Sequence, residues 1–353
     1  MTDTPRNNFW RRNWKMIVNV VTLVALAILI FAIWDQFEVT FKNLLKVNLF
    51  ALLLMIPVQI LNYDAQTRLY RSLFNLVGNK LSYKKLFQAS LELNFVNHVF
   101  PSGGVTGISY FGVRMKDDNI TAPKATAVQL LKLVLLFLSF EILIVFAVFA
   151  LAVQGHMNSV ILLLAGILTT LLVLGTLGFW FIIGDKKRIA GFFTYLTRAL
   201  NRSIHWFLKN NPETINIDKT KSTFEDLHEN YVLMSKDWRS LRRPFVWAMM
   251  ANVWEVMTIY VVYIAFGEFI NIGAVILAYA VANFAGLISV LPGGIGIYEG
   301  LMTLTLSATG VPSRLSLPVT IMYRVLSTII QLPPGYYFYH RNLRKTNFDT
   351  QDT

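Results

Sequence analysis

Residues 126–153 read TAVQLLKLVLLFLSFEILIVFAVFALAV, and residues 159–183 read SVILLLAGILTTLLVLGTLGFWFII. A helix of roughly 20 residues crosses the hydrocarbon core of a bilayer, and both stretches exceed that length. The whole chain of 353 residues is 55% hydrophobic and only 15% charged, whereas a soluble domain has roughly 25% charged residues. Such a chain needs lipid as its solvent, and the sequence predicts an all-α polytopic membrane protein.

Windows of about 19 residues predict four further spans, at residues 16–34, 45–63, 245–267 and 316–339. The first is expected to remain as an anchor, because no small-residue cleavage site precedes Asp35. Two other apolar stretches are each interrupted by a Pro/Gly cluster. The first cluster is PSGG at residues 101–104 and the second is PGGIG at residues 292–296.

Lys and Arg residues in the loops predict the orientation of the chain. The segments before the first span, after the second and after the last are basic, so both termini are expected in the cytoplasm. The same loops account for the net charge of +12, and nucleic acid is not an expected partner. The basic loops all lie in the cytoplasm only if residues 86–113 enter the membrane from the cytoplasm and return to it. Residues 272–309 must likewise enter from the outside and return there. The sequence therefore predicts six to eight transmembrane helices with two oppositely oriented re-entrant hairpins.

Opposed hairpins are what an inverted-topology repeat produces, and its broken segments point to a site near the bilayer midplane. Asn94 and Asn283 precede the prolines of the two clusters by seven and nine residues. Lys132 and Arg324 follow those prolines by 31 and 32 residues. These marks predict a single membrane domain over residues 1–353. Its parts are a first half at 12–184, a cytoplasmic basic insert at 185–243, a second half at 244–343 and a polar tail at 344–353.

The insert has 12 Lys or Arg residues against 7 Asp or Glu. Its aromatic and basic stretch at residues 192–209 is typical of an interfacial helix on anionic lipid. A solvated linker between the two halves is the alternative, and the residues do not decide between them.

A re-entrant loop is tolerated only where its backbone faces protein or a water-filled cavity. Glycine permits the sharp turn and the close approach of another group. Both Pro/Gly clusters are therefore expected to line a hydrated cavity, where the N-terminus of the following half-helix attracts an anion such as phosphate. Simple kinks in ordinary spans are the alternative.

Ionisable residues inside a membrane usually face a cavity or a partner. Those in the apolar stretches are Glu92, Lys132, Glu141, Glu255, Glu299 and Arg324. Lys132 and Arg324 either contact a phosphate or extend to the interface, and the guanidinium of Arg324 is suited to bidentate phosphate binding. Glu141 and Glu255 either take up a proton or make structural hydrogen bonds. Glu299 either caps the half-helix after the second cluster or contacts the ligand.

Catalytic patterns are not found in the sequence. The five histidines lack metal-ligand spacing such as HExxH, and we interpret His98, beside the first cluster, as structural. The chain has no cysteine and no GxSxG nucleophile motif. We expect no metal, no cofactor and no enzymatic activity.

The motifs NFVNHVFPSGGVTGISYFGVRM at residues 94–115 and LPGGIGIYEG at 291–300, with an Arg in the last span, carry a resemblance to a known family. From about residue 12 to 343 the chain resembles the lysylphosphatidylglycerol synthase transmembrane family, also called the flippase-like domain or uncharacterised protein family 0104. The resemblance implies two inverted halves with re-entrant helices that move an aminoacylated or glycosylated lipid across the bilayer.

The resemblance also implies lipid-contact positions. They are Pro101, Gly103, Gly104, Gly107, Arg114, Pro292, Gly293, Gly294, Gly296, Glu299 and Arg324. The chain departs from the family pattern at two places. Ile108 and Ser109 stand after the first cluster where many members have an acid, and Lys132 stands where an Arg is frequent.

Bifunctional members carry a soluble transferase domain after the membrane region, and no such domain follows the last span here, so aminoacyl transfer is not predicted. The expected function is flippase-like translocation of an anionic or isoprenoid-linked (glyco)lipid across the cytoplasmic membrane. The alternative is a non-transporting membrane partner or scaffold of a glycosyltransferase in envelope lipid or glycan synthesis. A membrane enzyme acting on a lipid head group is disfavoured by the absence of catalytic patterns. The lipid, the energy coupling and the oligomeric state stay open.

Overall fold

The computed structural model describes residues 34–44, 47–100, 105–155, 157–185, 238–288 and 296–345, with single positions between residues 24 and 31 and between 187 and 191. All regular structure in these residues is helical, which confirms the predicted all-α class. The helices are α2 Trp34–Leu44, α3 Leu49–Leu53, α4 Met55–Leu76, α5 Tyr83–Val99, α6 Val105–Lys116, α7 Ala122–Val153, α8 Ser159–Ile183, η1 Trp238–Leu241, α11 Arg242–Ala265, α12 Ile272–Ile288, α13 Ile297–Ala308 and α14 Ser313–Lys345.

Five helical segments of the described residues are long and apolar enough to cross a membrane, and they confirm five of the six predicted spans. They are Leu49–Leu76, Lys124–Val153, Ser159–Gly178, Arg239–Ala265 and Ser313–Asn342. The predicted span at 16–34 lies mostly outside the described residues. Also outside them are the first Pro/Gly cluster, nearly all of the second and most of the basic insert.

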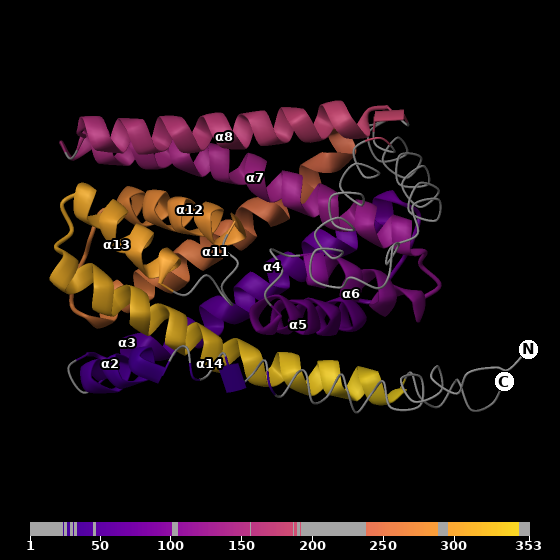
Figure 1. The fold of residues 1–353 in the computed structure, drawn as a ribbon, viewed down its shortest axis with the longest axis horizontal. Helices are drawn as coiled ribbons and strands as arrows, with labels where there is room; N and C mark the ends of the chain where they lie inside the picture. Colours follow the sequence, from indigo (N-terminus) through magenta and orange to yellow (C-terminus); the bar gives the residue numbers. More distant parts are fainter. Residues whose placement is uncertain are drawn as a thin grey trace, which may run out of the picture.

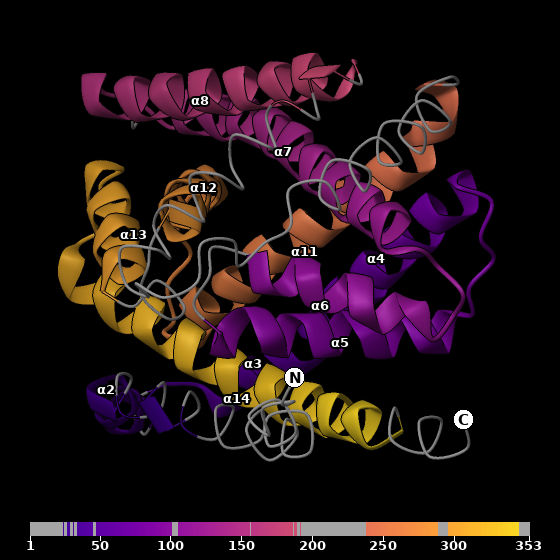
Figure 2. The same cartoon turned by 45° about the vertical axis from the view of Figure 1, so that its right-hand side comes forward.

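The helices form a bundle around a central crossing of α4 and α11 (Figures 1 and 2). Helices α7 and α8 run together along one side of this crossing, and α14 runs along the opposite side, next to α2. Each interrupted apolar stretch forms two packed helices, α5 with α6 and α12 with α13. In both views the two pairs lie toward opposite ends of the long axis.

Helix contacts cross between the N-terminal and C-terminal parts of the chain. Helix α5 packs on α14 and α12 packs on α7, while α6 packs on α7 and α13 on α14. Both crossed contacts include a glycine with no room for a side chain. A Cβ at Gly335 of α14 would lie 2.8 Å from the carbonyl oxygen of Leu91, and one at Gly273 of α12 would lie 2.5 Å from that of Ala147.

The two ends of the bundle are held by different chemistry. At one end, where α4 and α6 finish and α5 and α7 begin, Lys85 pairs with Asp118 and the Lys124 ammonium donates to the Asn79 side chain at 3.0 Å. At the other end, neutral amides make the links. Asn158 Nδ2 donates to the Ala308 carbonyl oxygen at 2.8 Å, and its Oδ1 caps α8 by accepting from Ile161 N at 2.9 Å.

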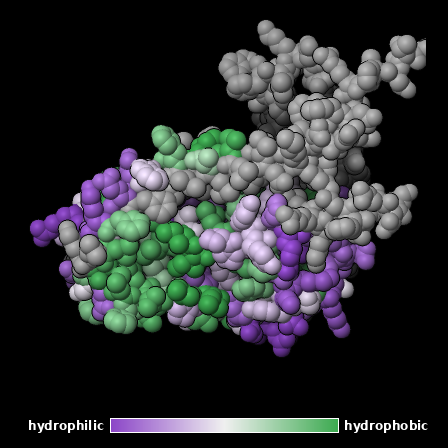
Figure 3. Space-filling model, turned by 90° about the horizontal axis from the view of Figure 1, so that it is seen from below, coloured by the Kyte–Doolittle hydropathy of each residue, from purple (hydrophilic) through white to green (hydrophobic). Residues whose placement is uncertain are grey.

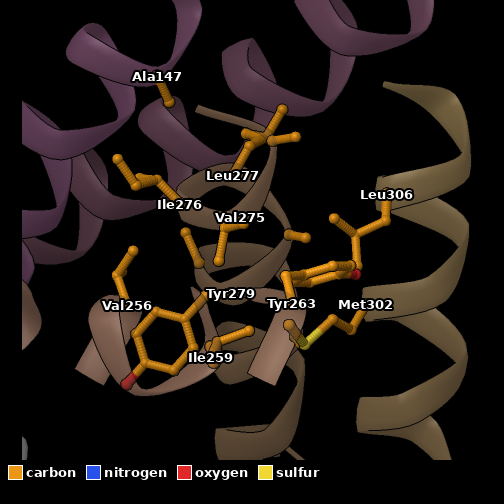
Figure 4. Close-up of a cluster of buried hydrophobic side chains, with 14 of the residues drawn as sticks. Ala147, Val256, Ile259, Tyr263, Val275, Ile276, Leu277, Tyr279, Met302 and Leu306 are labelled. Atoms are coloured by element: carbon orange, nitrogen blue, oxygen red, sulfur yellow. The ribbon is translucent and has the colours of Figure 1, made fainter. Parts of the chain in front are cut away.

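Large apolar side chains are found both inside the bundle and on its outer surface. Between α11, α12 and α13 the buried cluster includes Ile259, Tyr263 and Met302 (Figure 4). On the outside, Phe149 of α7 is 66% exposed and Leu163 of α8 is 62% exposed. Seen from below, hydrophobic surface gathers between hydrophilic surface at the two ends (Figure 3). A helical bundle with apolar side chains both in its interior and on its outer surface is stable in lipid. This pattern is typical of a multi-pass membrane protein.

Candidate functional site

A polar cavity of about 350 Å³ lies between α4, α5, α11, α12, α13 and α14. Its wall therefore includes helices from both of the interrupted pairs. The lining side chains are mostly amides, tyrosines and hydroxyls, with one carboxylate, one guanidinium and one imidazole. They are Asn62, Tyr63, Gln66, Asn94, Asn97, His98, Glu255, Tyr279, Asn283, Tyr298, Tyr323, Arg324, Ser327, Thr328 and Gln331.

A chain of amide hydrogen bonds makes one wall of the cavity rigid. Asn94 Nδ2 donates to the Tyr63 hydroxyl at 2.6 Å and to Gln331 Oε1 at 2.8 Å. Gln331 Nε2 donates in turn to Gln59 Oε1 at 2.9 Å, and Gln59 Nε2 donates to Thr258 Oγ1 at 3.3 Å. The chain joins α5, α4, α14 and α11, and a connected buried network of this kind fixes its members in one arrangement.

Among the described residues that line the cavity, Arg324 supplies the single guanidinium, and its position is set by α13. The guanidinium forms an ion pair with Glu299 and lies 4.8 Å from the centre of the Tyr298 ring. Glu299 Oε2 accepts a hydrogen bond of 2.6 Å from the backbone N–H of Gly296, whose φ of 84° suits glycine. Glu299 Oε1 also accepts from Gln36 Nε2 of α2 at 3.0 Å. The carboxylate thus caps α13 and holds Arg324 at once.

Glu255 supplies the cavity's carboxylate from the middle of α11. Its Oε1 accepts a hydrogen bond of 2.6 Å from the Tyr323 hydroxyl of α14. In the part of the chain that the structure describes, no Lys or Arg forms an ion pair with Glu255. Asn283 lines the same cavity from α12.

Lys132 lies behind the cavity wall, although its spacing from the first cluster matches that of Arg324 from the second. Its ammonium donates to Gln66 Oε1 at 3.2 Å and to the Tyr70 hydroxyl at 2.9 Å, and it lies 4.3 Å from the centre of the Tyr70 ring. Gln66 Nε2 donates to Asn62 Oδ1 at 2.7 Å. Among the described residues, Lys132 is therefore linked to the cavity through Gln66, which in turn donates to Asn62.

Two further predicted site residues lie away from the cavity. Arg114 Nε donates to Glu92 Oε2 at 2.9 Å, and both side chains are buried between α5 and α6. The Tyr110 hydroxyl donates to the same oxygen at 2.7 Å. Glu141 lies against α8, where Thr176 Oγ1 is 3.5 Å from its Oε1.

The glycines of the two motifs are only partly described. A Cβ at Gly107 would lie 2.0 Å from Asn97 Oδ1, so this glycine gives room to a side chain that lines the cavity. Gly296 begins α13, as described above. The predicted positions Pro101, Gly103, Gly104, Pro292, Gly293 and Gly294 lie outside the described residues. No group of three or more metal-ligating side chains occurs among the described residues.

Most of the cavity lining was not predicted from the sequence. The missed residues include Asn62, Gln66 and Gln331, and His98 was interpreted only as structural. A usable signal existed, because polar side chains recur four residues apart on apolar helices, as in Asn62 with Gln66 and Asn94 with His98. Residues at that spacing share one helix face, and polar groups in a membrane helix turn toward a cavity or a partner.

Comparison with known proteins gives consistent matches over most of the chain. The profile described as the lysylphosphatidylglycerol synthase TM region matches residues 16–335. A UPF0104 membrane protein of Pyrococcus horikoshii is 21% identical over 319 residues, which cover 90% of this chain and 93% of that protein. A UPF0104 membrane protein of Methanocaldococcus jannaschii is 20% identical over 307 residues, covering 84% and 85%.

Proposed function

Because the chain belongs to the lysylphosphatidylglycerol synthase transmembrane family, we propose that it moves an anionic or isoprenoid-linked (glyco)lipid across the cytoplasmic membrane. The observation that carries the proposal is the polar cavity, which lies inside a bundle with an apolar outer surface and contains a single guanidinium. A lipid head group crosses hydrocarbon only slowly without help, because transferring an unpaired polar or charged group out of water costs several kcal/mol. Polar side chains that line a cavity can form the hydrogen bonds that water would otherwise form, and so lower this cost.

We propose that α5 with α6 and α12 with α13 are the two re-entrant hairpins of an inverted repeat, entering from the cytoplasm and from the outside. Their places toward opposite ends of the bundle support this reading, and so do the crossed contacts of α5 with α14 and of α12 with α7. The end at which Lys85, Arg114 and Lys124 lie is assigned to the cytoplasm, since basic residues concentrate on that side. Both termini would then be cytoplasmic.

Arg324 is the proposed contact for the lipid phosphate. A guanidinium has five N–H donors in a fixed plane, so it can hold Glu299 and a phosphate together. The remaining lining is rich in amides and hydroxyls, which both donate and accept hydrogen bonds and suit a neutral polar or sugar-bearing head group. Glu255, which faces the same cavity without an ion-pair partner in the described chain, is the proposed site for taking up a proton.

Reconstitution into liposomes tests the proposal. Fluorescent phosphatidylglycerol and a fluorescent isoprenoid phosphate would be placed in the inner leaflet, and their arrival outside would be followed by chemical quenching. We expect the wild-type protein to accelerate the movement of at least one of them. Arg324→Ala should slow it, while Arg314→Ala, an exposed arginine at the start of the same helix, should not. No acceleration with either lipid, in correctly folded protein, would refute transport.

A scaffold for a glycosyltransferase is the second candidate function, and the basic insert at residues 185–243, with 12 Lys or Arg residues against 7 acids, favours it. In this proposal the insert binds the enzyme and the cavity plays no part in transport. Deleting residues 192–237 separates the two functions. Loss of enzyme recruitment without any loss of lipid movement assigns the insert to a partner, whereas a protein that recruits the enzyme but moves no lipid is a scaffold alone.

A further inference from the structure

An apolar groove of about 190 Å³ lies beside the polar cavity, between α7, α8 and α12. Leu136, Phe137 and Phe140 line it from α7, Leu168 and Leu172 from α8, and Ala280 from α12. Among the residues that the structure describes, neither a charged side chain nor a histidine lines it. The polar cavity has the opposite character, since most of its lining side chains carry a polar group.

The two spaces share a wall. Tyr279 and Asn283, one turn apart on α12, line both the groove and the cavity. On the groove side the Tyr279 ring lies 5.5 Å from the Phe140 ring, between ring centres. A tyrosine side chain has an apolar ring and a polar tip, so it suits a boundary between hydrocarbon and water. The junction has the polarity profile of an amphipathic ligand whose head group and chain separate at this point.

The groove has an exposed edge on α7. Leu133 lines the groove from α7 and is 37% exposed on the apolar outer surface. Asn252 of α11 forms the inner side, where its Nδ2 donates to the Leu136 carbonyl oxygen at 3.1 Å. The groove thus has an exposed apolar residue at its rim and a buried amide on its inner side.

We propose that this groove binds one hydrocarbon chain of the lipid whose head group occupies the polar cavity, with Tyr279 and Asn283 at the boundary between them. The inference rests on the proposed function, because it takes the cavity to hold a head group. It adds a chain-binding site on α7, α8 and α12 and a lateral route of entry. A groove that merely borders the bilayer would instead bind any neighbouring lipid, and no more strongly than the rest of the outer surface does.

Photocrosslinking distinguishes these cases. Phosphatidylglycerol with a diazirine at the end of one chain would be mixed at low abundance into phosphatidylcholine vesicles that contain the protein. After irradiation, mass spectrometry would map the adducts. We expect adducts to concentrate on residues 133–140 and 168–172 relative to Leu174, which is 60% exposed on α8 and does not line the groove. Excess unlabelled phosphatidylglycerol should reduce the groove adducts and leave those at Leu174 unchanged.

Two variants complete the test. Ala280→Phe fills the groove and should lower the groove adducts about tenfold or more, since displacing about two methylene groups weakens binding by roughly that factor. Leu133→Trp narrows the exposed rim, where a larger side chain has room, and should act in the same direction. Leu174→Trp is the control and should change nothing in the groove. Equal adduct density at the groove and at Leu174, or groove adducts unchanged in both groove variants, would overturn the inference.

The failure of this inference differs from the failure of transport. If wild-type protein concentrates the adducts in the groove but moves no lipid in the liposome assay, the binding site stands and the transport proposal fails. If lipid moves at the wild-type rate in Ala280→Phe and Leu133→Trp, the groove does not bind a chain of the moving lipid.

Discussion

The two interrupted helix pairs have the same construction but use their charged residues differently. In α5 and α6 the acid and the base belong to the same pair, since Glu92 of α5 binds Arg114 of α6 and both side chains are less than 10% exposed. In α13 the acid reaches outside its own pair, to Arg324 of α14 and Gln36 of α2. The first pair is thus closed on itself, whereas the second is tied to the cation that lines the cavity.

The difference teaches that two similarly packed helix pairs do not imply two similar sites. Lys132 and Arg324 follow their clusters at matching distances, yet only Arg324 lines the cavity. Both pairs line the cavity, α5 through Asn94 and α12 through Asn283, but only the second pair holds the cavity's arginine in place, through Glu299.

The largest expected effect comes from opening the first pair. Glu92→Ala removes the main partner of a buried arginine and should lower the free energy of unfolding by about 3–5 kcal/mol. Asp117→Ala is the control, because Asp117 is 47% exposed and 3.8 Å from Arg114, and a pair of that kind contributes about 1 kcal/mol or less. Thermal unfolding in detergent measures both. Equal losses in the two variants would mean that the Glu92 pair does not close the hairpin.

Substitutions in the contacts of α5 with α14 and of α12 with α7 should lower the free energy of unfolding by a smaller amount, and by a similar amount in both contacts. Gly335→Ala places a Cβ against the Leu91 carbonyl oxygen, and Gly273→Ala places one against that of Ala147. Overpacking of this kind costs about 1–3 kcal/mol. Gly166→Ala on α8 has no atom within 4 Å of the added Cβ and should be neutral or slightly stabilising. If only one of the first two variants is destabilised in the same unfolding assay, the two contacts are not equivalent.

The smallest expected effect concerns Lys132, the cation that does not line the cavity. Lys132→Gln removes hydrogen bonds to Gln66 and Tyr70, and because Lys132 reaches the cavity only through Gln66, lipid movement should fall by about threefold or less, the equivalent of under 1 kcal/mol. Arg324→Gln is the matched change in the second half and should slow movement about tenfold to a hundredfold, as expected for losing a hydrogen bond to a charged group. Rates measured side by side in liposomes that reverse this order would reverse the roles assigned to Lys132 and Arg324.

Four of the five described spans were predictable to within about six residues at each end because apolar composition defines them, whereas the observed segment Leu49–Leu76 continues well past the predicted end at residue 63. The predicted span at 126–153 corresponds to the observed segment Lys124–Val153. Asn94, Glu255, Asn283 and Arg324 were also named from sequence, and the structure brings these four together in one cavity. Whether they bind a lipid is still a prediction.

The rest of the cavity depends on how distant helices cross, and single-chain spacing does not contain that information. The amide chain from Asn94 to Gln59 passes through Gln331, which lies 237 residues after Asn94 in the sequence. Spacing likewise did not separate Lys132 from Arg324, because the direction of a side chain relative to the bundle axis is set by packing. A residue's depth in a span is readable from sequence, but its neighbour across the bundle is not.

The most direct test of the account is to obstruct the cavity itself. Ser327 lines it from α14, and its hydroxyl has no hydrogen-bond partner in the described part of the chain, so Ser327→Cys should be tolerated in a protein that has no cysteine. A charged thiol reagent attached at residue 327 should stop lipid movement, and phosphatidylglycerol should slow the attachment. The same adduct at the exposed Ser313→Cys should leave the rate unchanged. Movement at the wild-type rate with residue 327 fully modified would contradict the claim that the lipid head group passes through this cavity.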